Sequence, residues 1–365
     1  MKNSFGNSIV ITLFGESHGE YIGAVLDGLA PGIKIDHEYI KAKLDFRRPA
    51  GKISTARVEA DEYEIASGVF NGYTTGTPLC ILIKNTNKKS SDYGERLDIP
   101  RPSHADFTAR MKYHGFEDHR GGGHFSGRIT AALVAAGAIL ASALESKGIL
   151  IGSHITELHG AFDRPFDDIK ADITLVNGRQ FPVLSDNAEI SMKKEIEKAA
   201  ADGDSVGGIL ESGIVGLPAG LGEPWFDSME SMLSHGLFSI PAVKGVEFGL
   251  GFAFADVYGS EGNDAFAIEN NTVITKTNNN GGINGGITNG MPVVFRTVIK
   301  PTPSIFKAQD SVSLSNMENR SLKLEGRHDP AIIHRARAVV DAMTAIVVAD
   351  MLTVRYGTDY LSEKN

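Results

Sequence analysis

Residues 101–128 read RPSHADFTARMKYHGFEDHRGGGHFSGR, and residues 129–147 read ITAALVAAGAILASALESK. The first segment holds four of the eleven histidines, four arginines and a run of three glycines. Adjacent glycines let the backbone take positive φ and approach a ligand closely. The second segment is apolar on every face and rich in helix formers, which predicts a buried helix. A basic glycine loop that leads into a helix N-terminus is suited to an anion.

A second buried helix is predicted within GRHDPAIIHRARAVVDAMTAIVVADMLTVRY, residues 326–356, with Asp329 as its N-cap and Pro330 in its first turn. Shorter helices are predicted over 37–46, 189–201 and 224–238, and strands over 243–257. Strands outnumber helices, and most connections are too short for βαβ crossovers. We therefore predict an α+β fold, a layered sandwich with the two apolar helices buried between antiparallel β-sheets. No linker divides the chain, so we expect one domain over residues 1–365.

Composition restricts the class of protein. Apolar residues make up 42% and charged residues 22% of the 365 residues, as in globular proteins. The net charge of −9 argues against general binding to nucleic acid or to an anionic membrane. The single cysteine, Cys80, excludes an intrachain disulfide and is predicted to be a buried small apolar residue. The N-terminus lacks a signal-peptide pattern and neither apolar helix is suited to span a membrane, so we expect a cytoplasmic location.

Several standard motifs are absent from the sequence. No glycine loop ends in GK[ST], and no GxGxxG fingerprint occurs. The histidines have no metal-binding spacing such as HExxH, so we expect no metal site. GESHG, residues 15–19, is not the GxSxG elbow of a serine hydrolase. The prominent features are instead polar loops that border apolar elements, where sites are commonly built.

These loops combine two histidines, His18 and His104, with many arginines. Arginine binds phosphates and carboxylates through paired N–H groups, and histidine transfers protons near neutral pH. The combination suits a substrate with phosphate and carboxylate groups, and proton transfer to a leaving group. For each histidine a structural, hydrogen-bonded role is about equally compatible with the sequence. The same holds for Lys300 as the end of a strand.

Eight motifs in this order resemble the chorismate synthase family: GESHG, RRPAGK, RPSHADFT with KY, RGGG, VKGVEFG, GGINGGITNG, KPTPSI and GRHDP. The resemblance extends from about residue 5 to about residue 355. It implies a carbon–oxygen lyase that converts 5-enolpyruvylshikimate 3-phosphate to chorismate and phosphate. The reaction is a 1,4-trans elimination and the last shared step of aromatic amino-acid synthesis. It requires reduced FMN without net redox change.

The resemblance also implies roles for individual residues. It assigns His104 as the proton donor near the departing phosphate, His18 as the partner that manages the flavin proton, and Asp329 as the carboxylate near flavin N5. The candidates for substrate or NADP binding are Arg47, Arg48, Lys52, Arg101, Arg128 and Arg335. The family's flavin positions fall on His124, Phe125, Ser126, Pro241, Ala242, Gly285, Lys300, Pro301, Thr302, Pro303, Ser304 and Arg327. His124 and Phe125 depart from the Arg and small polar residue of many members.

The resemblance further implies a homotetramer that depends on an external flavin reductant. Some members reduce their own flavin with NADPH, and that alternative stays open here. Two other classes of function are weighed against the enzyme. A flavin-binding protein without catalysis would need neither the paired histidines nor the arginines. An anion-binding interaction module would not need KPTPSI or the Gly/Asn-rich loop.

Overall fold

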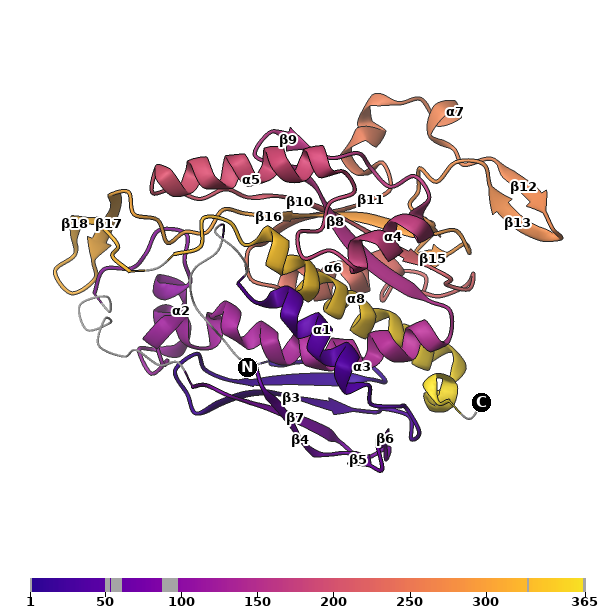
Figure 1. Cartoon of the computed structure of the whole chain (residues 1–365), viewed down its shortest axis with the longest axis horizontal. Coiled ribbons are helices and arrows are strands. Elements are labelled where there is room, and N and C mark those ends of the chain that lie inside the picture. The colour runs from indigo at the N-terminus through magenta and orange to yellow at the C-terminus, as the bar shows by residue number, and fades with distance from the viewer. Residues whose placement is uncertain (1, 50–52, 54–60, 87–97, 327, 364–365) are drawn as a thin grey trace.

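The computed structural model describes residues 2–49, 53, 61–86, 98–326 and 328–363. In this part of the chain, two five-stranded antiparallel sheets enclose a layer of helices (Figure 1). The first sheet has the strand order β1 (Ser4–Phe5), β2 (Val10–Gly15), β3 (Tyr21–Asp27), β7 (Leu79–Lys84) and β4 (Tyr63–Ser67). The second has the order β11 (Val243–Phe248), β16 (Val293–Ile299), β10 (Gly208–Val215), β8 (Leu150–Leu158) and β9 (Ala161–Phe162).

Two long helices, α3 (Thr130–Ser146) and α8 (Ile333–Tyr356), fill the space between the sheets. Helix α3 packs on β3 and β7 of the first sheet, and α8 packs on β8 and β10 of the second. The helices cross closely because a glycine lies at the contact: a Cβ on Gly137 would lie 2.5 Å from the Cβ of Ala342. The predicted α+β class and layered sandwich are confirmed.

The other helices surround this core. Helix α1 (His37–Arg47) packs on α3 and α8, α6 (Met229–Ser239) packs on α8 and β11, and α5 (Asp186–Ala201) packs on β9. Helix α4 (Ile169–Asn177) covers the outer face of the second sheet, where Ile169 and Ile173 meet Gly213 of β10. Two short helices, α2 (Asp106–Tyr113) and α7 (Gly259–Gly262), lie outside these layers.

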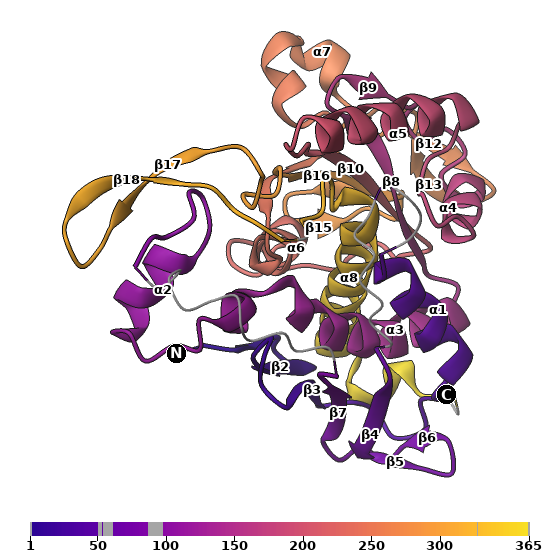
Figure 2. The same cartoon turned by 60° about the vertical axis from the view of Figure 1, so that its left-hand side comes forward.

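Short hairpins complete the described elements. They are β5 (Val69–Phe70) with β6 (Tyr73–Thr74), β12 (Phe266–Glu269) with β13 (Thr272–Thr275), β14 (Ile283–Asn284) with β15 (Ile287–Thr288), and β17 (Gln309–Ser313) with β18 (Glu318–Leu322). The β17–β18 hairpin and α2 project on the same side of the molecule (Figure 2), while β12 and β13 project elsewhere with α7 (Figure 1). The candidate site lies on the side of α2.

The described helix segment Gly127–Ser146 is long and apolar enough to cross a membrane, but 78% of its most apolar window is buried inside the structure. Its residues belong to one hydrophobic core that also includes Ile22 of the first sheet, Leu210 of the second sheet and Val340 of α8. Packing inside the protein therefore accounts for its apolar surface.

Several local predictions were wrong. Helix α8 begins at Ile333 with Ile332 at its N-cap, so Asp329 does not cap it and Pro330 does not lie in its first turn. The strand predicted over 243–257 ends at Phe248, because Gly249 and Gly251 take positive φ (55° and 57°) and a 3₁₀ turn follows.

Two further corrections concern side-chain burial and the length of a helix. Cys80 is half-buried, because strand alternation places it on the face of the first sheet that points away from the helices. The helix predicted over 224–238 begins at Met229, after Trp225 and Asp227 take positive φ.

Candidate active site

The three glycines of residues 121–123 form a tight arc between β2 and α3, with φ of 63°, 87° and 55°. A Cβ on Gly121 would lie 2.3 Å from Cε1 of His18, and a Cβ on Gly122 would lie 3.5 Å from Cε1 of His104. Only glycine can adopt this backbone with a histidine ring so close to Gly121. The arc therefore brings together the two histidines predicted to transfer protons.

His18 follows β2 and is 7% exposed. Its turn is tied to the glycine arc on two sides: Ser17 N donates to Gly123 O at 3.0 Å, and His124 Nδ1 lies 2.7 Å from Gly15 O. The predicted flavin residue His124 is thus engaged with the backbone of the GESHG turn. These contacts place the His18 ring against the arc.

His104 lies in a polar cluster with Arg101 and Asp106, the first residue of α2. Its Nδ1 is 2.6 Å from Asp106 Oδ1. Arg101 holds the same carboxylate through Nε and a terminal nitrogen, both at 2.8 Å. Burial raises the pKa of Asp106, but the hydrogen bonds from Arg101 and His104 outweigh burial and hold that pKa well below its usual range. Asp106 is therefore ionised at neutral pH.

The segment Lys300–Ser304, which we call the KPTPS strap, follows β16 and runs beside this cluster. Lys300 Nζ donates to Ser103 O at 2.6 Å, and Arg101 donates to Ser304 Oγ at 3.2 Å. Lys300 N also donates to Ala242 O at 2.9 Å, which brings the predicted pair Pro241 and Ala242 to the strap. Burial and the neighbouring Lys244 ammonium lower the pKa of Lys300.

Asp329 and Arg335 join the strap to the arginines of the first helix. Thr302 Oγ1 donates to Asp329 O at 2.8 Å, and Arg335 binds the Asp329 carboxylate at 2.8 Å. Arg335 Nε donates to Arg47 O at 2.7 Å. The side chain of Asp329, which is not an N-cap, is instead fixed by a guanidinium from the first turn of α8.

Arg47 and Arg128 share one buried carboxylate, that of Asp61. A terminal nitrogen of Arg47 lies 3.2 Å from Asp61 Oδ2, and Arg128 forms a close ion pair with Asp61 Oδ1. Arg128 Nε also donates to Asn85 Oδ1 at 3.0 Å, and Asn85 Nδ2 donates to Glu16 O at 3.0 Å. Asn85 therefore links the Asp61 cluster to the GESHG turn, which itself contacts the glycine arc.

Not every predicted site residue joins this arrangement. Gly285 lies in the turn between β14 and β15, whereas Lys300 follows β16. Arg48 pairs with Asp45 at the end of α1. Ser126 Oγ accepts from Arg128 N at 3.3 Å. Lys52 and Arg327 lie outside the described residues.

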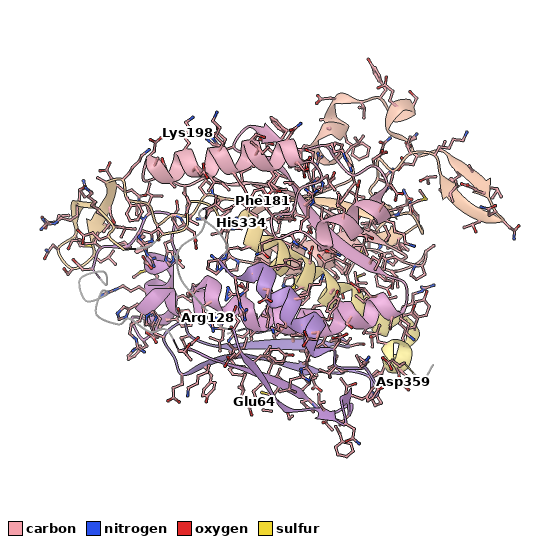
Figure 3. The ribbon with its side chains drawn as sticks, in the orientation of Figure 1. Glu64, Arg128, Phe181, Lys198, His334 and Asp359 are labelled. Carbon is pink, nitrogen blue, oxygen red and sulfur yellow. The ribbon has the colours of Figure 1, made fainter. Side chains whose placement is uncertain are left out.

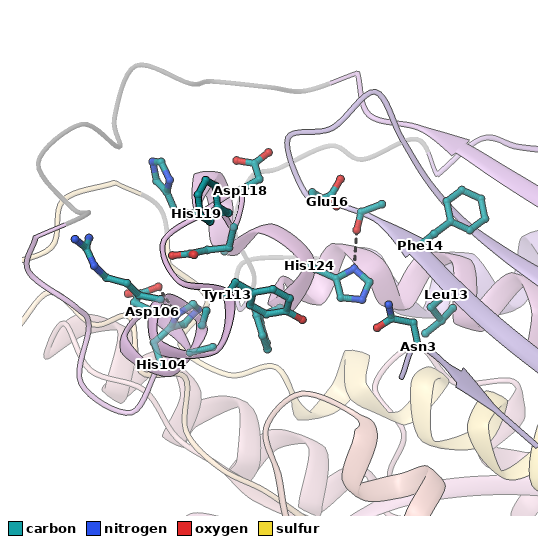
Figure 4. Close-up of a pocket in the computed structure, with 18 of the residues that line it drawn as sticks. Asn3, Leu13, Phe14, Glu16, His104, Asp106, Tyr113, Asp118, His119 and His124 are labelled. Carbon is teal, nitrogen blue, oxygen red and sulfur yellow. Dashed lines mark hydrogen bonds and ion pairs between the residues drawn. The ribbon is translucent and has the colours of Figure 1, made fainter. Parts of the chain in front are cut away.

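A cavity of about 350 Å³ adjoins the arc on the side of α2 (Figure 4). His104 and Asp106 lie at one end of it, and Asn3 and Leu13 lie at the other. Among the predicted site residues it is lined by Arg101, His104, His124 and Phe125. Phe125 meets Tyr113 edge to face, with ring centroids 6.0 Å apart.

Sequence reasoning missed three side chains of this site: Asp61, Asn85 and Asp106. Asp106 had a usable signal, since it stands two residues after His104 and near Arg101. Asp61 and Asn85 are linked to the site by tertiary contacts alone. Paired histidines, fixed guanidinium groups and a glycine arc are together suited to an enzyme that binds a multiply charged anion and transfers protons.

Comparison with known proteins identifies the family. The family model described as chorismate synthase matches residues 9–353. Chorismate synthases of Thermococcus gammatolerans and Pyrococcus abyssi are 47% and 46% identical, and each alignment covers 96% of this chain and 97% of the relative. That of Methanosarcina barkeri is 47% identical over 95% of both chains.

A crystal structure of a chorismate synthase superposes with a TM-score of 0.75 at 26% identity, covering 98% of this chain and 95% of the other. The chain belongs to the chorismate synthase family. Its activity is that of the family, a lyase reaction in aromatic amino-acid biosynthesis.

Proposed function

We propose that the site eliminates phosphate from 5-enolpyruvylshikimate 3-phosphate in a 1,4-trans reaction that yields chorismate and requires reduced FMN. The observation that carries the proposal is the glycine arc, which holds His18 and His104 together beside a set of fixed arginines. A protein that only stored flavin would need neither feature. The family membership makes the same reaction the leading candidate.

His104 is proposed to protonate the departing phosphate, and His18 to manage the proton on the flavin side of the site. Asp329 is proposed to act beside flavin N5 when the substrate loses its proton. The ion pair between Arg335 and Asp329 keeps this carboxylate oriented, since both side chains are less than one-fifth exposed. General acid–base catalysis of this kind contributes roughly 10²–10⁴-fold to a rate.

Arg47, Arg128 and Arg335 are proposed to bind the phosphate and carboxylates of the substrate, together with Arg48 and Lys52. Each guanidinium has about five N–H donors, and one carboxylate uses one or two of them. Asp61 therefore orients Arg47 and Arg128. Arg101 differs, because Asp106 and Ser304 engage its three side-chain nitrogens, which favours a positioning role.

The residues around the KPTPS strap fit a flavin phosphate. Lys300 and Lys244 are close enough for their charges to repel, which a bound phosphate dianion would relieve. Two hydroxyl groups lie in the same strap, those of Thr302 and Ser304. The backbone of the Pro241–Ala242 pair adjoins the strap through the bond from Lys300 N to Ala242 O. When bound, reduced FMN would supply the electron density that weakens the allylic C–O bond.

An anaerobic assay tests the proposal by following chorismate absorbance from the phosphorylated substrate. We expect one equivalent of reduced FMN to support many turnovers, because the reaction has no net redox change. Flavin oxidised in proportion to product would contradict it, as would tight flavin binding with no chorismate formed. NADPH with oxidised FMN should give no product unless a flavin reductase is added, since we propose an external reductant.

We further propose a cytoplasmic homotetramer in which residues 1–365 fold as one domain. The core that spans both sheets and the helices between them supports cooperative unfolding. Light scattering should give the mass of four chains. Calorimetry should show a single transition, and two separated transitions would contradict the one-domain assignment.

A further inference from the structure

We propose that Asp106 is a positioning residue for the reaction: it fixes the tautomer of His104 so that Nε2 carries out the proton transfer. This inference rests on the proposed role of His104, but its geometry stands independently. Asp106 Oδ1 lies 2.6 Å from His104 Nδ1, and the two side chains are 22% and 19% exposed. The contact is therefore largely shielded from water.

The distance fixes the position of one proton. An ionised carboxylate is only an acceptor, so 2.6 Å between Oδ1 and a ring nitrogen requires a proton on Nδ1. A terminal nitrogen of Arg101 lies 3.0 Å from the same Nδ1 and would favour the opposite tautomer if it donated there. That nitrogen lies closer to Asp106 Oδ1, at 2.8 Å, and bonds to the carboxylate. Neutral His104 therefore carries its proton on Nδ1.

The free nitrogen then faces the arc. A Cβ on Gly122 would lie 3.7 Å from His104 Nε2, so this nitrogen is directed toward the glycines where His18 also lies. With Nδ1 bound to Asp106, Nε2 is the atom that carries the transferred proton. The imidazolium gives this proton to the leaving phosphate oxygen as the C–O bond breaks, and the neutral ring that remains keeps its proton on Nδ1.

The Asp106 carboxylate is itself held in place. Arg101 binds it with Nε and a terminal nitrogen at 2.8 Å each, and Arg101 N donates to Oδ2 at 3.0 Å. His104 N donates to Arg101 O at 3.2 Å, so the three residues form one compact turn at the start of α2. The other charged or titratable side chains that line the same cavity are those of Glu16, Arg110, Glu117, Asp118, His119 and His124.

The same turn connects His104 to the proposed flavin site. Arg101 donates to Ser304 Oγ at 3.2 Å, and Lys300 donates to Ser103 O at 2.6 Å. The turn that holds the His104 ring therefore also contacts the KPTPS strap. A change at Asp106 should therefore disturb proton transfer more than ground-state binding of the substrate, since the arginines around Asp61 are held separately.

The first test reads the tautomer directly. ¹⁵N NMR of the imidazole of His104 in the flavin-free protein should show Nδ1–H in the neutral ring. In Asp106→Asn the proton should move mainly to Nε2, and Asp106→Glu should restore Nδ1–H in part. The matched control is Asp172→Asn, because Asp172 also binds an arginine, Arg164, through both terminal nitrogens and accepts a backbone N–H. A wild-type ring protonated on Nε2 would overturn the proposal.

The second test is kinetic, with reduced FMN saturating. We expect Asp106→Asn to lower kcat roughly a hundredfold, the lower edge of acid–base contributions, with KM within about threefold. Asp106→Glu should recover part of kcat, and Asp172→Asn should keep it. Unchanged kcat in Asp106→Asn would overturn the positioning role. Absence of turnover in the parent would contradict the proposed function instead, and the NMR result would still decide the tautomer.

Discussion

His104 and His154 both lie against carboxylates, but their surroundings differ. His104 is 2.6 Å from Asp106, next to a cavity of about 350 Å³. His154 of β8 is fully buried on the outer face of the second sheet, with Nε2 2.9 Å from Glu211 and Nδ1 3.6 Å from Asp163. The first pair is partly exposed and the second is sealed, so a carboxylate beside a histidine does not by itself identify a catalytic site.

The difference lies in what each histidine faces. Both ring nitrogens of His154 point at carboxylates, and Phe166 covers the ring at 4.6 Å between centroids. Burial lowers the pKa of His154, but the neighbouring carboxylates of Asp163 and Glu211 outweigh burial and raise it. His104 has one nitrogen on Asp106 and the other toward a glycine arc. An open nitrogen beside a cavity is the feature that separates a reactive histidine from a structural one.

The largest effect should come from His104→Ala and His18→Ala. Each should lower kcat roughly 10²–10⁴-fold, because each removes a proposed proton carrier. Thermal melts should stay close to the parent, since neither ring is the centre of a sealed ion cluster. Turnover with reduced FMN saturating, measured beside the melts, checks both statements. Full activity in both variants would leave the proposed mechanism without its proton carriers.

The second effect, on stability, should come from His154→Leu. The change leaves the carboxylates of Glu211 and Asp163 buried without their cation, and breaking such a cluster costs about 3–5 kcal/mol. Urea unfolding measures the loss. The kcat per folded molecule should stay within about twofold of the parent. Loss of kcat with unchanged stability would show that the His154 cluster is functional and that the comparison fails.

The fold was predictable where apolar patterning is strong. Helix α3 spans 130–146 within the predicted 129–147, because its residues are apolar on every face. Helix α2 was missed, since Asp106–Tyr113 is polar and short, and its start depends on contacts with Arg101 and His104. The cap assigned to Asp329 failed because the residue pairs with Arg335.

The site was predictable where sequence neighbours carry the signal. The glycine run and His104 stand within one segment, and glycines flank His18 at one residue's distance on one side and three on the other. Asp61 and Asn85 carry no local signal, because their roles come from Arg47, Arg128 and the GESHG turn, which are distant in sequence.

A further histidine, buried in α8, extends the comparison to the dependence of stability on pH. His334 of α8 stacks on Phe181 (Figure 3), and burial, with a smaller contribution from Arg335, lowers its pKa to about 4. Its unfolded value is about 6.5. Between these values the unfolded chain binds a proton that the folded chain does not, so stability falls as pH falls.

The expected loss from His334 is about 3 kcal/mol by pH 4, on the basis of 1.36 kcal/mol per unit of pKa. Urea unfolding from pH 7 to pH 4 measures it. The control is His334→Phe, which keeps a ring against Phe181 and should give a flatter dependence over this window. An identical slope in the parent and the variant would assign the acid sensitivity to other groups.

The smallest effect should come from Asp329. This residue combines features of a structural ion pair with features of a site residue. Its carboxylate forms an ion pair with Arg335 at 2.8 Å, like a structural group, yet its backbone contacts the KPTPS strap, like a site residue. Helix capping no longer competes as an explanation, because α8 begins at Ile333. Asp329→Asn keeps an acceptor for Arg335 but cannot carry charge or take a proton.

We expect Asp329→Asn to melt near the parent temperature and to lose roughly tenfold or more in kcat, below the usual acid–base range because only one step depends on it. Arg335→Lys is the matched variant: it keeps the positive charge next to Asp329 but gives up the planar contact and the bond to Arg47 O. If Asp329 acts on the substrate, its own variant should lower kcat while Arg335→Lys mainly raises KM. If the pair is only structural, both variants should melt earlier, by similar amounts, with kcat retained.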